Sequence, residues 1–112
     1  MIYKECIDKC FDTVKACDRL SVEGCETAKD CKPAHCHAVI CAEVCALVGR
    51  LTAKGVCHKE LYDLCAKICD ECKSKCEDID NKYAKDCMDA CKKSAESCRT
   101  CSEDCKKCEK SD

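Results

Sequence analysis

Cysteines at helical spacing are the residues in this sequence that most clearly indicate chemistry. The last six are separated by 4, 7, 3, 4 and 3 residues and are Cys87, Cys91, Cys98, Cys101, Cys105 and Cys108. Residues three and four apart share one face of an α-helix, so these thiols should form a single stripe. The pattern is a heptad seam in which sulfur stands where a bundle helix normally carries Leu or Ile.

Further cysteines at the same spacing predict three more helices facing this stripe. We expect helices over residues 2–22, 33–53, 57–78 and 81–109, joined by short connections. Four helices joined in this way predict an all-α fold, an antiparallel up-down-up-down four-helix bundle with a cysteine-lined core. The 112 residues have room for one domain, which we assign to residues 1–112.

The ends of these helices carry recognisable signals. Gly24 and Gly55 are suited to the position just after a helix. Pro33 fits the first helical turn, where its missing N–H costs nothing. Asp80 is the expected N-cap of the last helix.

Fifteen cysteines are expected to point into the bundle: Cys6, Cys10, Cys17, Cys41, Cys45, Cys65, Cys69, Cys72, Cys76, Cys87, Cys91, Cys98, Cys101, Cys105 and Cys108. Cys36 does not fit the seam, because five residues before Cys41 is about 140° away around a helix. Cys25, Cys31 and Cys57 fall in or beside connections and are candidate ligands outside the stripe.

The spacing favours metal binding over disulfide formation. Helical neighbours at i and i+4 hold their Cβ atoms about 5–6 Å apart, whereas a disulfide needs about 3.5–4.5 Å. Two thiolates on one metal have sulfurs roughly 4.5 Å apart, twice a metal–sulfur bond of about 2.3 Å. The count of 19 cysteines is odd, and the chain has only three Gly and one Pro. A disulfide-built structural protein is therefore disfavoured.

Charge indicates which metal the thiolates bind. Soft thiolates select Cu(I), Zn(II) or iron–sulfur clusters. Several Zn(II) sites with four thiolates each would bury a large negative charge, whereas bridged Cu(I) at about one ion per cysteine leaves a nearly neutral core. Multiple Cu(I) ions per chain are thus the expected cargo.

Three alternatives remain open. A metallothionein-like buffer would hold Zn(II) or Cd(II) on the same thiolates. An iron–sulfur protein would use Cys98, Cys101 and Cys105, although no closing Cys-Pro is present. A thiol redox protein would need one low-pKa thiolate, for which Cys36 between His35 and His37 is the candidate.

Composition excludes other classes. The 20 basic and 22 acidic residues give a net charge of −2 and are evenly mixed, which disfavours nucleic acid as a partner. We expect no apolar run of membrane-spanning length and no signal peptide at the start, so no membrane association. Abundant thiols then favour the reducing cytoplasm. The expected role is binding and not catalysis.

Three segments resemble the bacterial copper storage proteins, which are cysteine-lined four-helix bundles. They are residues 41–47 (CAEVCAL), 64–72 (LCAKICDEC) and 87–91 (CMDAC). The resemblance covers nearly the whole chain and implies storage of many Cu(I) ions by thiolates. It also implies a cytosolic protein that forms homo-tetramers.

The sequence departs from that family in two respects. Thr13, Tyr62 and Ser94 stand where the family usually continues its cysteines. The connection over residues 77–83 lacks the histidines that the cytosolic members have near their open end. The start of the second helix lies at the same end of such a bundle, so we expect His35 and His37, with Cys36, to receive Cu(I) there.

Overall fold

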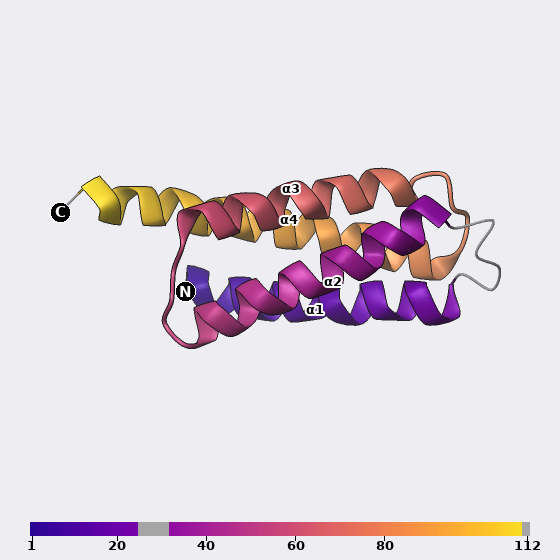
Figure 1. Ribbon diagram of the computed structural model, residues 1–112, viewed down its shortest axis with the longest axis horizontal. Coiled ribbons are helices and arrows are strands. Elements are labelled where there is room, and N and C mark those ends of the chain that lie inside the picture. Colours follow the sequence, from indigo (N-terminus) through magenta and orange to yellow (C-terminus); the bar gives the residue numbers. More distant parts are fainter. Residues whose placement is uncertain (25–31, 111–112) are drawn as a thin grey trace.

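Four antiparallel helices make up the fold (Figure 1). The computed structural model describes residues 1–24 and 32–110, with side chains described for 1–24 and 33–105. The helices are α1 (Ile2–Glu23), α2 (Lys32–Ala53), α3 (Lys59–Cys76) and α4 (Lys82–Lys110). The last turns of α4 extend past the other helices, beyond the start of α1 (Figure 1).

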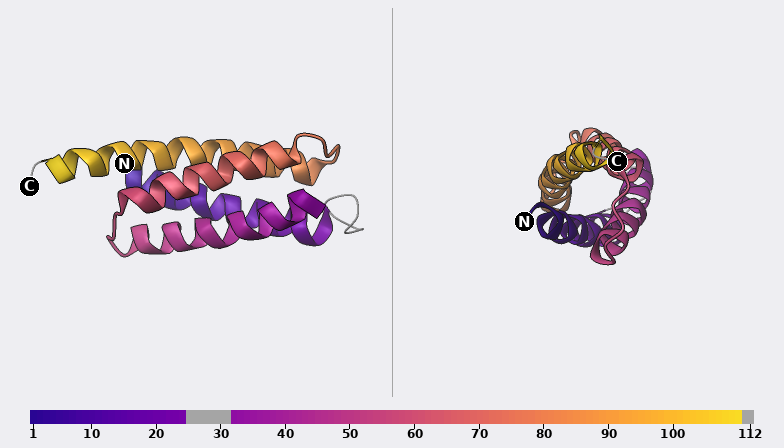
Figure 2. Two further views of the ribbon diagram at one scale, coloured as in Figure 1. Left: turned by 45° about the horizontal axis from the view of Figure 1, so that its top comes forward. Right: turned by 90° about the vertical axis from the view of Figure 1, so that its left-hand side faces the viewer.

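Each helix packs against two others and surrounds a central axis. Seen along this axis, the helices form a ring in chain order, α1, α2, α3 and α4 (Figure 2). The α1 and α4 helices close the ring. Helices on opposite sides of it meet through side chains at the axis, where the sulfurs of Cys41 and Cys91 are 3.9 Å apart. The bundle is long and narrow, with extents of 51 × 20 × 18 Å. The predicted up-down-up-down four-helix bundle is confirmed.

The ends of α2 follow the sequence signals. Pro33 lies in the first turn. At the other end Gly55 has a φ of +80°, and its N–H donates to the Thr52 carbonyl while the Val56 N–H donates to that of Leu51. These two bonds form a Schellman motif, in which glycine adopts the left-handed conformation at little cost. Gly24 also follows its helix, but with φ of −88°.

The connection between α3 and α4 differs from the prediction. The α3 helix spans Lys59–Cys76 and is shorter than the expected 57–78. His58 occupies the N-cap position with an extended backbone and is exposed, so it lies outside the helix. Asn81, and not Asp80, caps α4, because its Oδ1 accepts the Ala84 N–H at 2.8 Å. The Asn81 Nδ2 also donates to the Gly24 carbonyl at 3.1 Å, which ties the end of α1 to the start of α4.

The core consists mainly of cysteine and alanine. Among the described residues, the larger apolar or aromatic side chains that are fully or almost fully buried in it are Leu20, Val48 and Tyr62, and partly buried ones such as Tyr3 pack against it. Neutral thiols behave as small hydrophobes. The heptad spacing turns them inward, while charged residues cover the outside and form pairs such as Lys93 with Asp89 at 3.1 Å.

The α2 helix corrects one expectation from the sequence. Residues 33–53 are long and apolar enough to cross a membrane by length and composition, so the expectation that no run reaches this length was wrong. Within the bundle, however, this helix places Cys41, Cys45 and Val48 in the core. Such a signal is also typical of a core helix in a protein outside the membrane, and here the helix packs between α1 and α3.

Candidate metal centre

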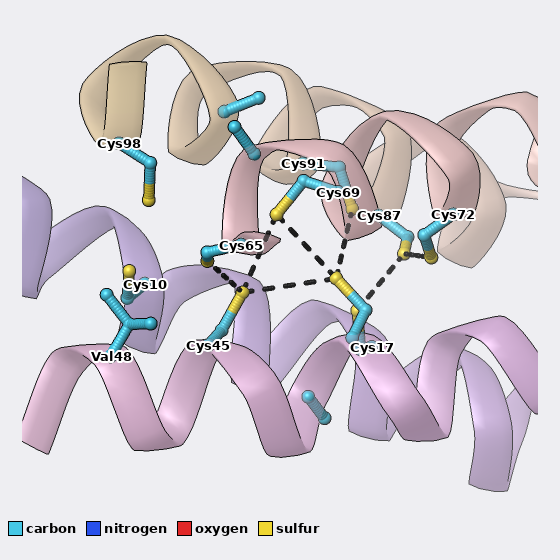
Figure 3. Packing of buried hydrophobic residues seen from close by; sticks show 14 of the residues in the cluster. Cys10, Cys17, Cys45, Val48, Cys65, Cys69, Cys72, Cys87, Cys91 and Cys98 are labelled. Carbon is cyan, nitrogen blue, oxygen red and sulfur yellow. Dashed lines mark hydrogen bonds between the residues drawn. The ribbon is translucent and has the colours of Figure 1, made fainter. Parts of the chain in front are cut away.

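Thiols from all four helices meet along the bundle axis. Every helix contributes at least two, and the described side chains include fourteen buried cysteines: Cys6, Cys10, Cys17, Cys41, Cys45, Cys65, Cys69, Cys72, Cys76, Cys87, Cys91, Cys98, Cys101 and Cys105. Figure 3 shows the sulfur atoms of several of them, among them Cys45, Cys69 and Cys91, between the helices. These are fourteen of the fifteen cysteines expected to point inward. The fifteenth, Cys108, is in α4, but its side chain lies outside the described part of the structure.

The sulfur atoms are close to one another without being bonded. Within single helices the Sγ atoms of Cys6 and Cys10 lie 4.0 Å apart, and those of Cys41 and Cys45 lie 3.9 Å apart. Between helices the separation falls to 3.5 Å for Cys17 and Cys87. A disulfide needs about 2.05 Å, and the sixteen cysteines whose side chains are described are all free.

These separations suit shared metal coordination. Three sulfurs at about 2.3 Å from one metal, arranged in a plane, lie about 4.0 Å apart, whereas two opposite sulfurs lie about 4.6 Å apart. Sulfurs of Cys45 and Cys69 at 3.6 Å, and of Cys45 and Cys65 at 3.7 Å, are therefore near the three-coordinate value. The thiols need to move only slightly to accept an ion.

Five groups of thiols have all their sulfur atoms within 4.8 Å of one another. The groups are Cys6/Cys10/Cys98, Cys10/Cys45/Cys65, Cys41/Cys45/Cys69, Cys17/Cys41/Cys72/Cys91 and Cys72/Cys76/Cys87. All members are buried, and every group combines at least two helices. The bundle thus presents several preformed thiolate sites and not one isolated site.

Burial and contact between thiols raise the pKa of some core cysteines, while contact lowers the pKa of others. Contact with Cys10, together with the neighbouring thiols and burial, raises the pKa of Cys65 well above the ordinary thiol value. Contact with Cys17 lowers the pKa of Cys87 to about 5, against the effect of burial. Hydrogen bonding explains these opposite pKa shifts, because a sulfur that accepts S–H hydrogen bonds is stabilised as a thiolate. Metal binding must displace protons from the raised members, so it should weaken in acid.

Two polar residues interrupt the sulfur lining on neighbouring helices. Thr13 is fully buried on α1, and its Oγ1 donates to the carbonyls of Lys9 at 2.9 Å and Ala90 at 3.1 Å. Ser94 is fully buried on α4, with its Oγ 3.8 Å from the Cys10 sulfur and 3.9 Å from the Cys45 sulfur. Sulfur is therefore missing on α1 and α4 near the middle of the core.

A hydrogen-bonded layer closes the end of the bundle at the start of α1. The Tyr62 hydroxyl is 2.8 Å from the Thr52 Oγ1, and both side chains are buried. The Tyr3 hydroxyl donates to Asp104 at 2.5 Å and lies 3.8 Å from the Cys105 sulfur. We call this layer, made of Tyr3, Thr52, Tyr62 and Asp104, the tyrosine end.

Sequence reasoning missed two residues of this layer. Tyr3 lies three residues before Cys6, so it continues the same helical stripe, and this spacing was the available signal. Asp104 carries no comparable signal, because its role depends on where α1 meets α4. Burial raises the pKa of Tyr3, and the hydrogen bond to Asp104 adds to the rise.

A layer of apolar side chains closes the opposite end. Leu20, Ala34 and Ala84 are buried there at 0–1% exposure. The start of α2 lies beside the connection from α3 to α4, since Pro33 and Ala34 line a cavity of about 460 Å³ together with Glu77 and Asp78. We call the layer of Leu20, Ala34 and Ala84 the leucine end.

The remaining predicted ligands lie outside the thiol groups. His35 and Cys36 are exposed, and His37 is half-buried, near the leucine end. No group of ligand atoms among the described residues includes either histidine. Cys57 is exposed in the connection from α2 to α3, at the tyrosine end. Cys25 and Cys31 lie outside the described residues.

Comparison with known proteins supports a metal-storing bundle. The family model described as "Csp: Copper storage protein" matches residues 2–110. A curated relative, the "Uncharacterized cysteine-rich protein YhjQ" of Bacillus subtilis (strain 168), is 33% identical over 88 residues, which cover 76% of this chain and 82% of the relative. The solved structure "Cu(I)-bound Copper Storage Protein BsCsp3" matches with a TM-score of 0.85 and 28% identity, covering 91% of this chain and 99% of that one.

Proposed function

Because the chain belongs to the copper storage protein family, we propose that it stores multiple Cu(I) ions on the thiolates inside its four-helix bundle. The observation that carries this proposal is the set of five buried thiol groups with sulfurs within 4.8 Å. The similar structure of BsCsp3 is described as Cu(I)-bound, and it matches nearly the whole bundle. The cysteines in those groups, with Cys101, Cys105 and Cys108, are the proposed ligands.

The geometry and the charge of the core both favour Cu(I) over Zn(II). The groups overlap, so a sulfur must bridge two ions when neighbouring sites are filled. Bridged Cu(I) at about one ion per thiolate is nearly neutral, whereas separate four-thiolate Zn(II) sites each carry a charge of about −2 in a low-dielectric core. The metallothionein-like alternative is therefore less favoured.

An anaerobic titration tests the proposal. Reduced protein is titrated with Cu(I) in the presence of a competing chelator, and free thiols are counted before and after. We expect saturation near one Cu(I) per core thiol and far weaker uptake of Zn(II). Saturation at one or two Cu(I) per chain, or preference for Zn(II), would contradict storage of copper.

We also propose that copper is received at the leucine end by His35, Cys36 and His37. The Nδ1 of His37 donates to the Pro33 carbonyl at 2.9 Å, so Nε2 is the ring nitrogen left to bind a metal. His35 and Cys36 are exposed, six and five residues before the buried Cys41. Glu77, Asp78 and Lys75 line the neighbouring cavity, and their net negative charge favours a cation there.

The histidines at the two ends provide a matched test. The double variant His35→Ala/His37→Ala should load Cu(I) more slowly than the parent protein at unchanged capacity. His58→Ala is the control, because His58 is exposed at the tyrosine end. If the double variant and the control load at the same rate, the leucine end is not the site of uptake.

The remaining parts of the proposal concern the domain organisation, the cellular compartment and the oligomeric state. We propose a single storage domain without catalytic activity that acts in the cytoplasm, where free thiols stay reduced. The sixteen free cysteines with described side chains fit this compartment. The homo-tetramer follows from the family resemblance, and sedimentation velocity of the loaded protein tests it.

A further inference from the structure

The five thiol groups form an unbranched series along the bundle. Cys6/Cys10/Cys98 shares Cys10 with the next group, which shares Cys45 with Cys41/Cys45/Cys69. That group shares Cys41 with Cys17/Cys41/Cys72/Cys91, which in turn shares Cys72 with the last group. Each successive pair of groups has one sulfur in common, so four shared sulfurs connect the tyrosine end to the leucine end.

The middle of this series has few sulfur ligands, because α1 and α4 carry Thr13 and Ser94 there in place of cysteine. Ser94 lies beside both Cys10 and Cys45, and Thr13 directs its hydroxyl to the backbone carbonyls of Lys9 and Ala90. A hydroxyl is a poor ligand for Cu(I), which prefers soft sulfur. At this level the lining therefore depends mainly on α2 and α3, with Cys10 as the contribution of α1.

Cys45 is the thiol at this point of the series. Its sulfur is 3.9 Å from that of Cys41, 3.6 Å from that of Cys69 and 3.7 Å from that of Cys65 (Figure 3). It belongs to one group on each side of the interruption. Cys65 and Cys69, one turn apart on α3, also interact with each other. Among the described side chains, however, no group contains both of them, so the closest links between the two halves pass through Cys45.

We propose that the copper store consists of two segments connected mainly through the thiolate of Cys45. This inference rests on the proposed storage of Cu(I). One segment comprises the two groups nearer the tyrosine end, and the other comprises the three groups nearer the leucine end. Cu(I) crosses by ligand exchange, in which it gains a bond to the Cys45 sulfur and then loses a bond to a sulfur behind it. The ion stays Cu(I), and no electron or proton is transferred.

Removal of copper from the loaded protein tests the connection. Parent protein, Cys45→Ser and Cys91→Ser are loaded anaerobically and mixed with an excess of a Cu(I) chelator, and the coloured complex is followed with time. Cys91 is a matched control because it is equally buried but belongs to only one group, which keeps three thiols without it. Both variants should hold less copper than the parent.

Only Cys45→Ser should show a new slow phase. The segment next to the exit should lose its Cu(I) at the parent rate. The far segment should lose its Cu(I) at least about tenfold more slowly, which corresponds to about 1.4 kcal/mol in the activation free energy of Cu(I) removal. The double variant Cys45→Ser/Ser94→Cys should lose this slow phase, because a sulfur on α4 replaces the connection. A purely structural effect of the first substitution would not be reversed in this way.

The possible outcomes separate the two proposals. Equal removal kinetics for Cys45→Ser and Cys91→Ser would overturn the two-segment inference, while storage itself would stand. If Cys45→Ser does not fold, Ser94→Cys in the parent protein is used instead, and it should speed the slowest phase of removal. An unchanged phase there would also overturn the inference. Failure of the parent protein to bind Cu(I) would instead refute the storage proposal.

Discussion

The two ends of the bundle are closed by different chemistry. At the tyrosine end, hydroxyls and a carboxylate form hydrogen bonds between helices, with Tyr62 bound to Thr52 and Tyr3 bound to Asp104. At the leucine end, the side chains of Leu20, Ala34 and Ala84 fill the space, and the Asn81 side chain donates one hydrogen bond to the Gly24 carbonyl at the end of α1. Hydrogen bonds are directional and costly to leave unmade, whereas apolar contacts tolerate small displacements. The comparison indicates that the helices at the leucine end can move apart at a smaller cost in free energy than those at the tyrosine end.

Removing the apolar closure should have the largest effect on stability. Leu20→Ala deletes the only large buried aliphatic side chain of α1 in the described core and leaves a cavity. We expect a loss of about 2–5 kcal/mol in the free energy of unfolding of the reduced apo-protein. Anaerobic urea unfolding measures it. A loss below about 1 kcal/mol would show that the neighbouring alanines collapse into the space and that Leu20 is not the closure.

Removing one hydrogen bond at the tyrosine end should have a smaller effect. Tyr62→Phe keeps the ring but leaves the buried Thr52 hydroxyl without this partner. The expected loss is about 1–3 kcal/mol, the cost of a buried polar group that loses its bond. The double variant Tyr62→Phe/Thr52→Val is the control, since removing both polar groups should recover much of that loss.

The cap of α4 should contribute about as much as an ordinary hydrogen bond. Asn81→Ala removes the bond from the Ala84 N–H and also the bond to the Gly24 carbonyl, both near the leucine end. We expect a loss of about 1 kcal/mol. Asp80→Ala is the matched control, because Asp80 is exposed and forms only a 3.5 Å ion pair with Lys85. Equal losses for the two variants would show that Asn81 does not act as the cap.

The smallest effect concerns pH and should appear only at the tyrosine end. Burial raises the pKa of Tyr3 and of Tyr62 in the folded protein above the ordinary value of about 10. Their contribution to stability is therefore complete below about pH 10 and falls as the pH rises above it. The variant Tyr3→Phe/Tyr62→Phe should lose less stability than the parent between pH 9 and pH 11. Tyr83→Phe, at the other end, should follow the parent.

The sequence was sufficient to predict which side of each helix a residue occupies, because this depends only on the helical period. The spacing of Cys87, Cys91 and Cys98 on one face required no knowledge of the partner helices, and the same rule placed Cys36 outside the seam. The bundle, its four helices and its inward thiols followed from this period. Local capping was less certain, because Asp80 and Asn81 are adjacent and are both good N-caps.

The contacts between helices could not be predicted in the same way. Which sulfur of α2 meets which sulfur of α3 depends on how far the helices slide along each other, and a shift of one turn moves a side chain by about 5.4 Å. The junction at Cys45 and the pairing of Tyr3 with Asp104 depend on that register. The spacing rule therefore located the lining but not the order of the sites within it.

The two exposed thiols with described side chains lie at opposite ends of the molecule, Cys36 near the leucine end and Cys57 at the tyrosine end. In air, thiols that reach solvent oxidise before thiols that are buried. Disulfides between copies through these two thiols would then join molecules end to end, since the part of the chain with described side chains has one exposed sulfur near each tip. Such joining would produce linear chains along the 51 Å axis and not closed particles. Non-reducing gels of aged protein should show a ladder, and Cys36→Ser/Cys57→Ser should remove it.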